Sequence, residues 1–292
     1  MNSDIISSVR QNGSGYKIKK NSIIVIKKIV SLLLFVVVLA SCGEYQKALK
    51  TEDVAVKFEV ATKLYDEGKY ADAIRLIEQI APSYRGKPQA EKLFYMFSMS
   101  YYNTKQYYLA AYQFESFVSG YPRSEKIEEA SYLGAKCFAI QSNRTSPYSL
   151  DQVDTYKAIE KLQEFIDIYP NSTYLPEANK SLRELNDKIE RKVFENAKQY
   201  NTIMEYKAAM VALDNFVSDY PGTPYKEDAL FYKYDSAYQL AINSVPDKME
   251  ERLNIAKTAY YSLIKFKPDT KHKKLADEMF ARIETDLKNF TK

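Results

Sequence analysis

The side chains that could perform nucleophilic or acid–base chemistry in this 292-residue chain are few and scattered. The one histidine, His272, stands in a run of lysines, where we expect a solvated imidazole. Acid pairs such as Glu128-Glu129 fall on predicted helix surfaces, where solvation explains them better than catalysis. A hydrolase or transferase needs a nucleophile, a base or a metal site held together. We therefore expect no enzyme, no metal site and no cofactor.

A single thiol, that of Cys42, carries the strongest chemical signal. It closes the sequence Leu39-Ala40-Ser41-Cys42, after a basic stretch and an uncharged apolar run over 29–40. Twelve residues rise about 18 Å in a helix, against roughly 30 Å of hydrocarbon, so the run is typical of a signal peptide rather than a membrane span. Small residues before a cysteine form the bacterial lipoprotein cleavage box, in which the thiol receives a diacylglycerol. We predict lipidation of Cys42, with a plain secretory signal as the alternative.

Cleavage before Cys42 would remove a signal peptide, 1–41, that holds six of the 42 basic residues and one of the 38 acids. The remaining charges nearly balance, so net charge gives no support to nucleic-acid binding. Two or more acyl chains anchor a protein stably, and the protein would bind the membrane through acylated Cys42. Gly43, rather than Asp, follows the cysteine and resembles the outer-membrane sorting pattern of lipoproteins. We expect a lipid anchor in the outer membrane, with the protein facing the periplasm.

With Cys42 acylated, Cys137 would be the one thiol left, and a disulfide within the mature chain would be excluded. Cys137 lies in a helical pattern between Lys136 and Phe138. We therefore expect it to be a small buried apolar residue rather than a reactive one.

A repeated sequence pattern predicts the elements that make up the mature chain. An alanine is followed by apolar residues four and seven positions later and then by Tyr-Pro, most clearly in Ala110, Phe114, Phe117 and Tyr121-Pro122. Similar copies begin at Ala158 and Ala209, and weaker ones at Ala73 and Ala256. These offsets place one apolar stripe on a helix, which the proline ends. Five such helices predict a stacked-helix solenoid.

Each copy predicts the second helix of a hairpin, and a first helix lies just upstream. The first helices carry a small residue followed three positions later by a larger apolar one, as in Ala61/Leu64, Ser98/Tyr101 and Ala197/Tyr200. The fold class expected is all-α, a tetratricopeptide-like α-solenoid of about five helical hairpins plus a C-terminal capping helix. The expected parts are a tether over 42–51, N-terminal repeats over 52–170 (units 1–3), and C-terminal repeats (units 4–5) with the cap over 171–292. Loops are expected at 141–150 and 243–248, and one long helix over 174–200.

Binding is predicted in an inner groove formed by the first helices. The residues three before, one after and four after each small residue should point into it; they are Phe58, Thr62, Tyr65, Tyr95, Met99 and Tyr102. Aromatic and methionine side chains in a groove suit an extended peptide. Packing of these side chains against a neighbouring repeat is the alternative. The basic residues of 174–200, such as Lys188 and Arg191, alternate with acids and predict an exposed face.

A lipoprotein box followed by five tetratricopeptide-like hairpins with Phe-x-x-x-Tyr-Pro endings resembles the BamD family, the repeat lipoproteins of the β-barrel assembly machinery. The resemblance covers Leu39 to about Phe290. It implies a non-catalytic scaffold that contacts a BamA-like barrel-insertion subunit through its C-terminal repeats. It also implies that the N-terminal repeats bind the C-terminal signal strand of unfolded outer-membrane β-barrel proteins, whose final aromatic residue would fit the predicted groove. A generic envelope lipoprotein that scaffolds cell-wall or division enzymes is the alternative.

Overall fold

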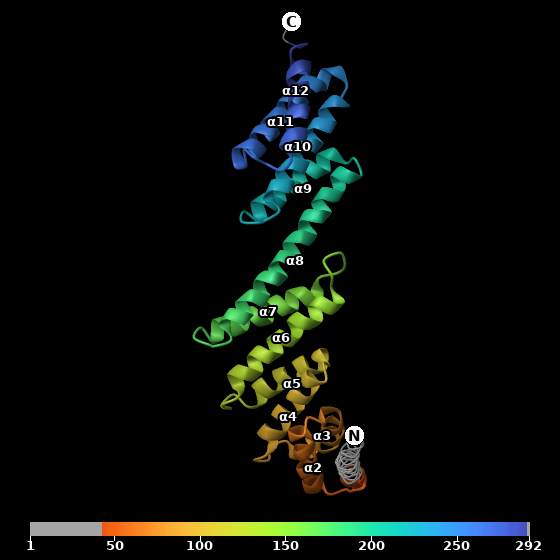
Figure 1. Ribbon diagram of the computed structural model, residues 1–292, viewed down its shortest axis with the longest axis vertical. Coiled ribbons are helices and arrows are strands. Elements are labelled where there is room, and N and C mark those ends of the chain that lie inside the picture. Colours follow the sequence, from red (N-terminus) through yellow and green to blue (C-terminus); the bar gives the residue numbers. More distant parts are fainter. Residues whose placement is uncertain (1–42, 291–292) are drawn as a thin grey trace, which may run out of the picture. The chain divides into compact units, whose positions relative to one another are not determined.

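The computed structural model describes residues 43–290, and nearly all of them lie in helices, with no strand among them. The described residues pack into two compact units, one that ends at Ser124 and one that begins at Glu125. Within each unit, helices that follow one another in the chain lie side by side as antiparallel hairpins (Figure 1). The all-α fold class is therefore confirmed.

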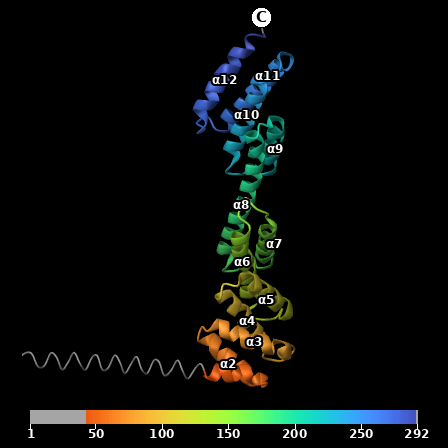
Figure 2. The same cartoon turned by 90° about the vertical axis from the view of Figure 1, so that its right-hand side faces the viewer.

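The first unit consists of a short helix over 43–50 and two hairpins (Figure 2). Asp53 begins the first hairpin, because its Oδ1 accepts the backbone N–H of Ala55 at 2.8 Å and that of Val56 at 3.3 Å. The hairpin helices are α2 (Val54–Asp66), α3 (Tyr70–Tyr84), α4 (Ala90–Asn103) and α5 (Tyr107–Gly120).

The second unit holds three hairpins and a final helix, so the expected five hairpins and capping helix are present over the described residues. The third hairpin packs in the same compact unit as the fourth and fifth. The functional division at 170/171 stays a prediction. The helices of this unit are α6 (Ile127–Thr145), α7 (Val153–Ile168), α8 (Leu175–Thr202), α9 (Tyr206–Asp219), α10 (Lys226–Ile242), α11 (Pro246–Phe266) and α12 (Lys273–Leu287).

The apolar seam of the repeat forms the core of every hairpin. All five key alanines are 0% exposed, which lets the two helices of each hairpin approach closely; they are Ala73, Ala110, Ala158, Ala209 and Ala256. The residues four and seven positions later are also buried in every copy. On the first helices, Ala61/Leu64 and Ser98/Tyr101 are buried as predicted, but Tyr200 is 43% exposed. The next residue, Asn201, joins the fourth hairpin to the fifth, because its Nδ2 donates to Asp235 Oδ2 on α10 at 2.8 Å.

Three of the hairpins share one turn geometry. Gly68, Lys105 and Met204 all adopt a left-handed backbone, with φ of 74°, 61° and 65°. In each turn the next backbone N–H donates to a carbonyl five residues earlier, which closes the first helix in a Schellman motif. Glycine adopts this conformation without strain, whereas lysine and methionine do so at a cost of about 1–2 kcal/mol.

The links between repeats follow a second pattern, which the sequence analysis missed. Five residues after the tyrosine or lysine of the Tyr-Pro or Lys-Pro pair, an aromatic ring precedes the next helix and stacks on a ring of the preceding first helix. The three stacked pairs are Tyr174 on Tyr132, Tyr225 on Phe194, and His272 on Phe231, with interplanar angles of 11°, 11° and 6°. The prediction of a solvated His272 is therefore wrong, because this histidine occupies a repeat position that holds tyrosine elsewhere.

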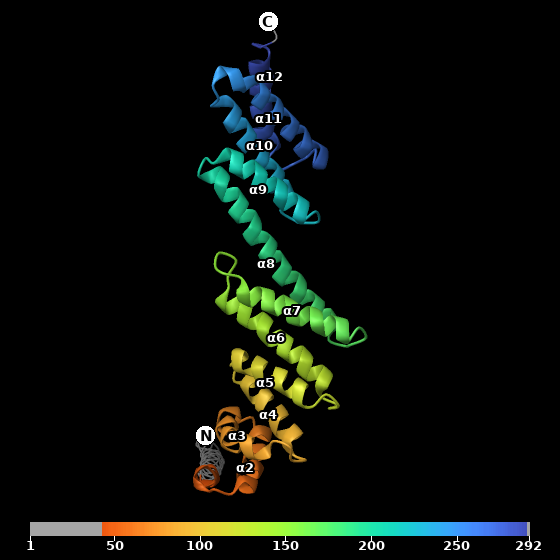
Figure 3. The same ribbon diagram turned by 180° about the vertical axis from the view of Figure 1, so that it is seen from behind.

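The long helix predicted over 174–200 is confirmed as α8, which packs against both α7 and α9 (Figure 3). Its basic residues are not simply an exposed face. Lys188 Nζ donates to Ser142 Oγ at 2.6 Å, and Lys192 Nζ donates to the carbonyl of Leu150 at 2.6 Å. The loop between α6 and α7 is thus held on α8, and it begins only after Thr145 because α6 is longer than expected.

The segment predicted to be a tether over 42–51 is helical from 43 to 50. Tyr45 and Ala48, three residues apart and so on one helix face, are 8% and 0% exposed. The helix is therefore docked on the first hairpin, where it lies beside α2 (Figure 2). Cys42 itself, with the signal peptide, lies outside the described residues.

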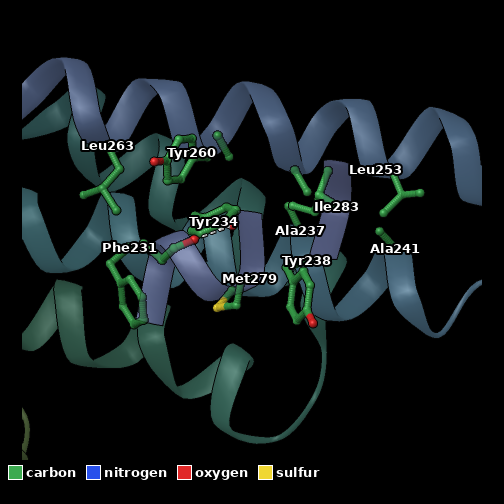
Figure 4. Close-up of a cluster of buried hydrophobic side chains, with 13 residues drawn as sticks. Phe231, Tyr234, Ala237, Tyr238, Ala241, Leu253, Tyr260, Leu263, Met279 and Ile283 are labelled. Atoms are coloured by element: carbon green, nitrogen blue, oxygen red, sulfur yellow. Dashed lines mark hydrogen bonds between the residues drawn. The ribbon is translucent and has the colours of Figure 1, made fainter. Parts of the chain in front are cut away.

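The last hairpin and α12 enclose a well-defined apolar core (Figure 4). At its centre, Tyr234 is fully buried and its hydroxyl donates to the Ala276 carbonyl at 3.1 Å, which ties α10 to α12. Elsewhere in this unit Cys137 is fully buried, and burial raises the pKa of its thiol to about 12, as expected of an inert residue. Across residues 43–290, no helix combines the length and apolar character that a membrane crossing requires.

Candidate peptide-binding groove

A shallow groove of about 500 Å³ opens on the first unit, between α2 and the start of α4. Two of the six predicted groove residues, Phe58 and Thr62, line it. They lie four residues apart on α2 and therefore share one helix face. The remaining lining side chains are charged: Glu59, Lys63, Asp66, Glu67 and Lys92.

Phe58 forms the aromatic surface of this groove. Its ring stacks on Tyr84, with centroids 5.0 Å apart and planes 12° apart. Tyr84 is buried, and its hydroxyl donates to the carbonyl of Val54 at 3.4 Å. The ring on which Phe58 stacks is therefore held in place. Phe58 remains half-buried and offers its other side to the groove. A ring fixed in this way can bind another apolar group with little loss of side-chain entropy.

Thr62 adjoins Phe58 and contacts the second hairpin. Its hydroxyl donates to the Phe58 carbonyl at 2.9 Å and lies 4.0 Å from the Met96 sulfur on α4. The hydroxyl is thus occupied within its own helix. We infer that Thr62 shapes the groove more than it donates to a ligand.

The charges around the groove differ in how they are paired. Lys63 pairs with Glu44 of helix 43–50, and Glu67 pairs with Lys69 at 2.8 Å, an interaction that lowers the Glu67 pKa. Lys92 has no carboxylate partner in the described part of the chain, and its Nζ lies 6.0 Å from the centroid of the Phe58 ring. The groove therefore presents one unpaired cation beside one exposed aromatic face.

The predicted tyrosines lie elsewhere, packed within their own hairpins. Tyr65 meets the edge of Tyr70 at 5.5 Å between centroids, and Tyr95 meets Phe117 at 5.6 Å. Tyr102 makes similar edge contacts with Tyr107 and Phe114. These three tyrosines, like Met99, are half-buried and do not line the groove. The structure thus brings together Phe58 and Thr62 and leaves the other four apart.

Sequence reasoning missed Lys92, the cation of the groove. Lys92 lies six residues before Ser98, one helical turn beyond the offsets used to find the groove. Residues at positions 92, 95, 96 and 99 share the α4 face that runs along the seam. Extending the offsets by one turn would have found it. Within residues 43–290, no group of three or more potential metal-ligating side chains occurs.

Comparison with known proteins adds an independent observation. Residues 51–253 match the family model YfiO, described as an outer membrane lipoprotein. This chain belongs to the YfiO family of outer membrane lipoproteins. The match covers the four hairpins from α2 to α9 and continues into the fifth.

Three relatives carry the name outer membrane protein assembly factor BamD. The protein from Haemophilus influenzae is 20% identical over 247 residues, which cover 82% of this chain and 94% of the relative. The Buchnera aphidicola protein is 25% identical over 243 residues, with coverages of 80% and 96%. The Caulobacter vibrioides protein is 21% identical over 193 residues, or 65% of this chain and 61% of the relative. Membership in the YfiO family confirms the resemblance to BamD, and with it an outer-membrane assembly factor rather than an enzyme.

Proposed function

We propose that this YfiO-family protein is a periplasm-facing scaffold, acylated at Cys42, that helps unfolded outer-membrane β-barrel proteins to fold and insert. Its N-terminal repeats, 52–170, bind the C-terminal signal strand of these clients. Its C-terminal repeats, 171–292, bind a BamA-like barrel-insertion subunit. The names of the curated relatives and the helical tiling of both units support a role in assembly by binding.

The pairing of Phe58 with Lys92 is the observation that carries the client-binding part. A signal strand that ends in an aromatic residue presents a ring and a terminal carboxylate close together. Phe58 offers a stacking surface for the ring, and the unpaired Lys92 ammonium offers a charge-assisted hydrogen bond to the carboxylate. The remaining strand would then extend along the rim of the groove.

A titration with synthetic peptides tests this proposal. A peptide with a C-terminal phenylalanine and free carboxylate should bind, and amidation of its C-terminus should weaken binding by about tenfold, the equivalent of about 1.4 kcal/mol. Phe58→Ala should weaken binding of both peptides, whereas Lys92→Gln should weaken only the free-acid peptide. Tyr112→Ala, an exposed aromatic on α5 that lies outside the groove, is the matched control.

Unchanged affinity in Phe58→Ala would remove this groove from the proposal. If Tyr65→Ala combined with Tyr102→Ala weakened binding in its place, the client would occupy the predicted tyrosines. Those two variants also need a stability control, because both rings pack within their hairpins.

The partner-binding part is tested by purification from solubilised envelopes. Recovery of a barrel-insertion subunit with the full chain, and its loss when the chain is truncated after 170, would support the proposal. Recovery of wall hydrolases without that subunit would favour the generic envelope scaffold.

A further inference from the structure

We propose that helix 43–50 is a rigid coupling between the lipid anchor and the first hairpin, and that it opens the peptide groove at the lipid headgroup surface. The proposal rests on the acylation of Cys42 stated above. It assigns a new interaction surface, the end of the first unit around helix 43–50 and the C-terminal half of α2. Its partner is the headgroup layer of the membrane that holds the acyl chains.

Helix 43–50 is fixed by side-chain contacts with both helices of the first hairpin. Ala48 is fully buried and Tyr45 nearly so. The Tyr45 ring lies beside Asp72 and Arg75 of α3, and burial, followed by the Asp72 carboxylate, raises the pKa of its hydroxyl. On the other side, Glu44 pairs with Lys63 of α2. The first turn of the helix is thus held between α2 and α3.

The connection from helix 43–50 to α2 is three residues long and hydrogen-bonded. The Thr51 N–H donates to the Lys47 carbonyl at 3.1 Å, and the Asp53 N–H donates to Thr51 Oγ1 at 3.1 Å. Asp53 in turn caps α2. Two of the three residues between the helices, Thr51 and Asp53, are therefore tied by hydrogen bonds, which restrict movement of helix 43–50 relative to α2.

The docked helix limits the distance between the acyl chains and the first hairpin. A flexible tether over 42–51 would let the acyl chains lie up to about 35 Å from the hairpin, because an extended chain spans about 3.5 Å per residue. Because Glu44 and Tyr45 contact the hairpin, only Gly43 separates Cys42 from the first fixed side chain of this unit. The headgroup layer must then meet the surface at the first turn of the helix.

The surface around helix 43–50 adjoins the peptide groove. A second cavity, of about 570 Å³, lies between helix 43–50 and α2. Glu59 and Lys63 line both this cavity and the peptide groove, so a single row of α2 side chains separates the two. The groove therefore lies about one helix diameter, roughly 10 Å, from the docked helix. A client strand bound there would be held next to the membrane into which it inserts.

The charges of this surface indicate what kind of membrane it needs. Helix 43–50 and residues 59–69 carry four acids and four lysines, all exposed, so their charges balance; they are Glu44, Glu59, Asp66 and Glu67, and Lys47, Lys50, Lys63 and Lys69. A surface without net charge gains little from anionic lipids. We therefore expect this surface to contact a neutral, zwitterionic headgroup layer, with the acyl anchor as the sole source of membrane affinity.

The test uses the lipidated full chain in phosphatidylcholine vesicles, in a Cys137→Ala background that leaves no free thiol. A fluorophore is attached through Asp66→Cys at the groove, or through Arg123→Cys at the other end of the first unit; both native residues are exposed. Nitroxide-labelled headgroups should quench the label at position 66 much more than the label at 123. Equal quenching of the two would overturn the proposal.

Two changes separate docking from folding. Insertion of about ten Gly-Ser residues after Gly43 adds a tether with a mean span of roughly 18 Å and leaves the docked helix intact. It should remove the excess quenching at position 66, as should Ala48→Glu, which forces a charge into a buried site; Ala48→Ser is the control. Quenching that persists after the insertion, or that appears only with anionic lipid, contradicts the proposal. Peptide affinity in detergent should be the same with and without the insertion. Peptide binding therefore tests the proposed groove, whereas quenching tests its position at the membrane, and the two proposals can fail independently.

Discussion

The imidazole of His272 lies face to face on the ring of Phe231, with centroids 3.9 Å apart and planes 6° apart. Its Nε2 is 2.7 Å from Asp228 Oδ1. Tyr225 has the same relationship one repeat earlier, because it stacks on Phe194 and its hydroxyl donates to Asp187 at 3.2 Å. In both repeats, therefore, the aromatic residue just before the first helix stacks on a ring of the preceding repeat and contacts a carboxylate of that repeat.

Replacement of His272 should loosen α12. His272→Ala removes the stack and the Asp228 contact, and we expect it to lower the free energy of unfolding of the second unit by about 1–3 kcal/mol. His272→Tyr should retain most of this stability, because tyrosine fills the equivalent positions. Chemical denaturation followed by circular dichroism measures both variants, and equal losses would contradict the repeat equivalence.

Low pH should weaken the packing of α12 on α10, because it protonates Glu227. Its carboxylate accepts from Lys267 Nζ, Thr270 Oγ1 and the Lys271 N–H at 2.6–2.7 Å, and these bonds hold its pKa at about 2, below the ordinary 4.5. Since the folded-state pKa is the lower one, the stabilisation is complete above about pH 4.5 and is lost as the pH falls towards 2.

This loss of stability can be measured by thermal unfolding and by amide hydrogen exchange of α12 between pH 5 and pH 2. Glu227→Gln should be less stable at pH 5 and should depend less on pH over this window. Glu278→Gln, at an exposed position on α12, is the matched control. An unchanged pH profile in Glu227→Gln would show that other carboxylates account for the acid sensitivity.

In the shared hairpin turn, substitutions at Gly68 and Met204 should change the free energy of unfolding in opposite directions. Gly68→Ala forces a side chain into the left-handed conformation and should destabilise the first unit by about 1–2 kcal/mol. Met204→Gly relieves that strain at an exposed position of the second unit and should be neutral or stabilising by up to about 1 kcal/mol. Denaturation midpoints compare both with the parent chain. Destabilisation by Met204→Gly would show that its side chain makes a contact that outweighs the strain.

Loss of the Cys42 thiol should release the protein from the membrane. Cys42→Ala should abolish acylation, and the chain should move from the membrane fraction to the soluble fraction of the envelope. Metabolic labelling with an alkyne fatty acid, combined with fractionation, measures both effects. Cys137→Ala, which changes the buried thiol, should leave acylation and fractionation as they are.

The repeats show how much of this protein local sequence determined. The alanine stripes beginning at Ala73, Ala110 and Ala158 predicted helices, seams and hairpins correctly, because helical periodicity and small-residue packing act over a few residues. The long α8 followed in the same way from an uninterrupted helical pattern. The family match covers these same repeats, over residues 51–253.

Only the tertiary structure decided which side chains meet across the repeats. It stacked His272 on Phe231, docked the expected tether through Tyr45, and set Lys92 beside Phe58. The tyrosines predicted to line the groove, Tyr65, Tyr95 and Tyr102, pack within their own hairpins instead. The contacts of His272, Tyr45 and Lys92 join residues 20 or more positions apart, so they depend on how whole helices pack rather than on any local pattern.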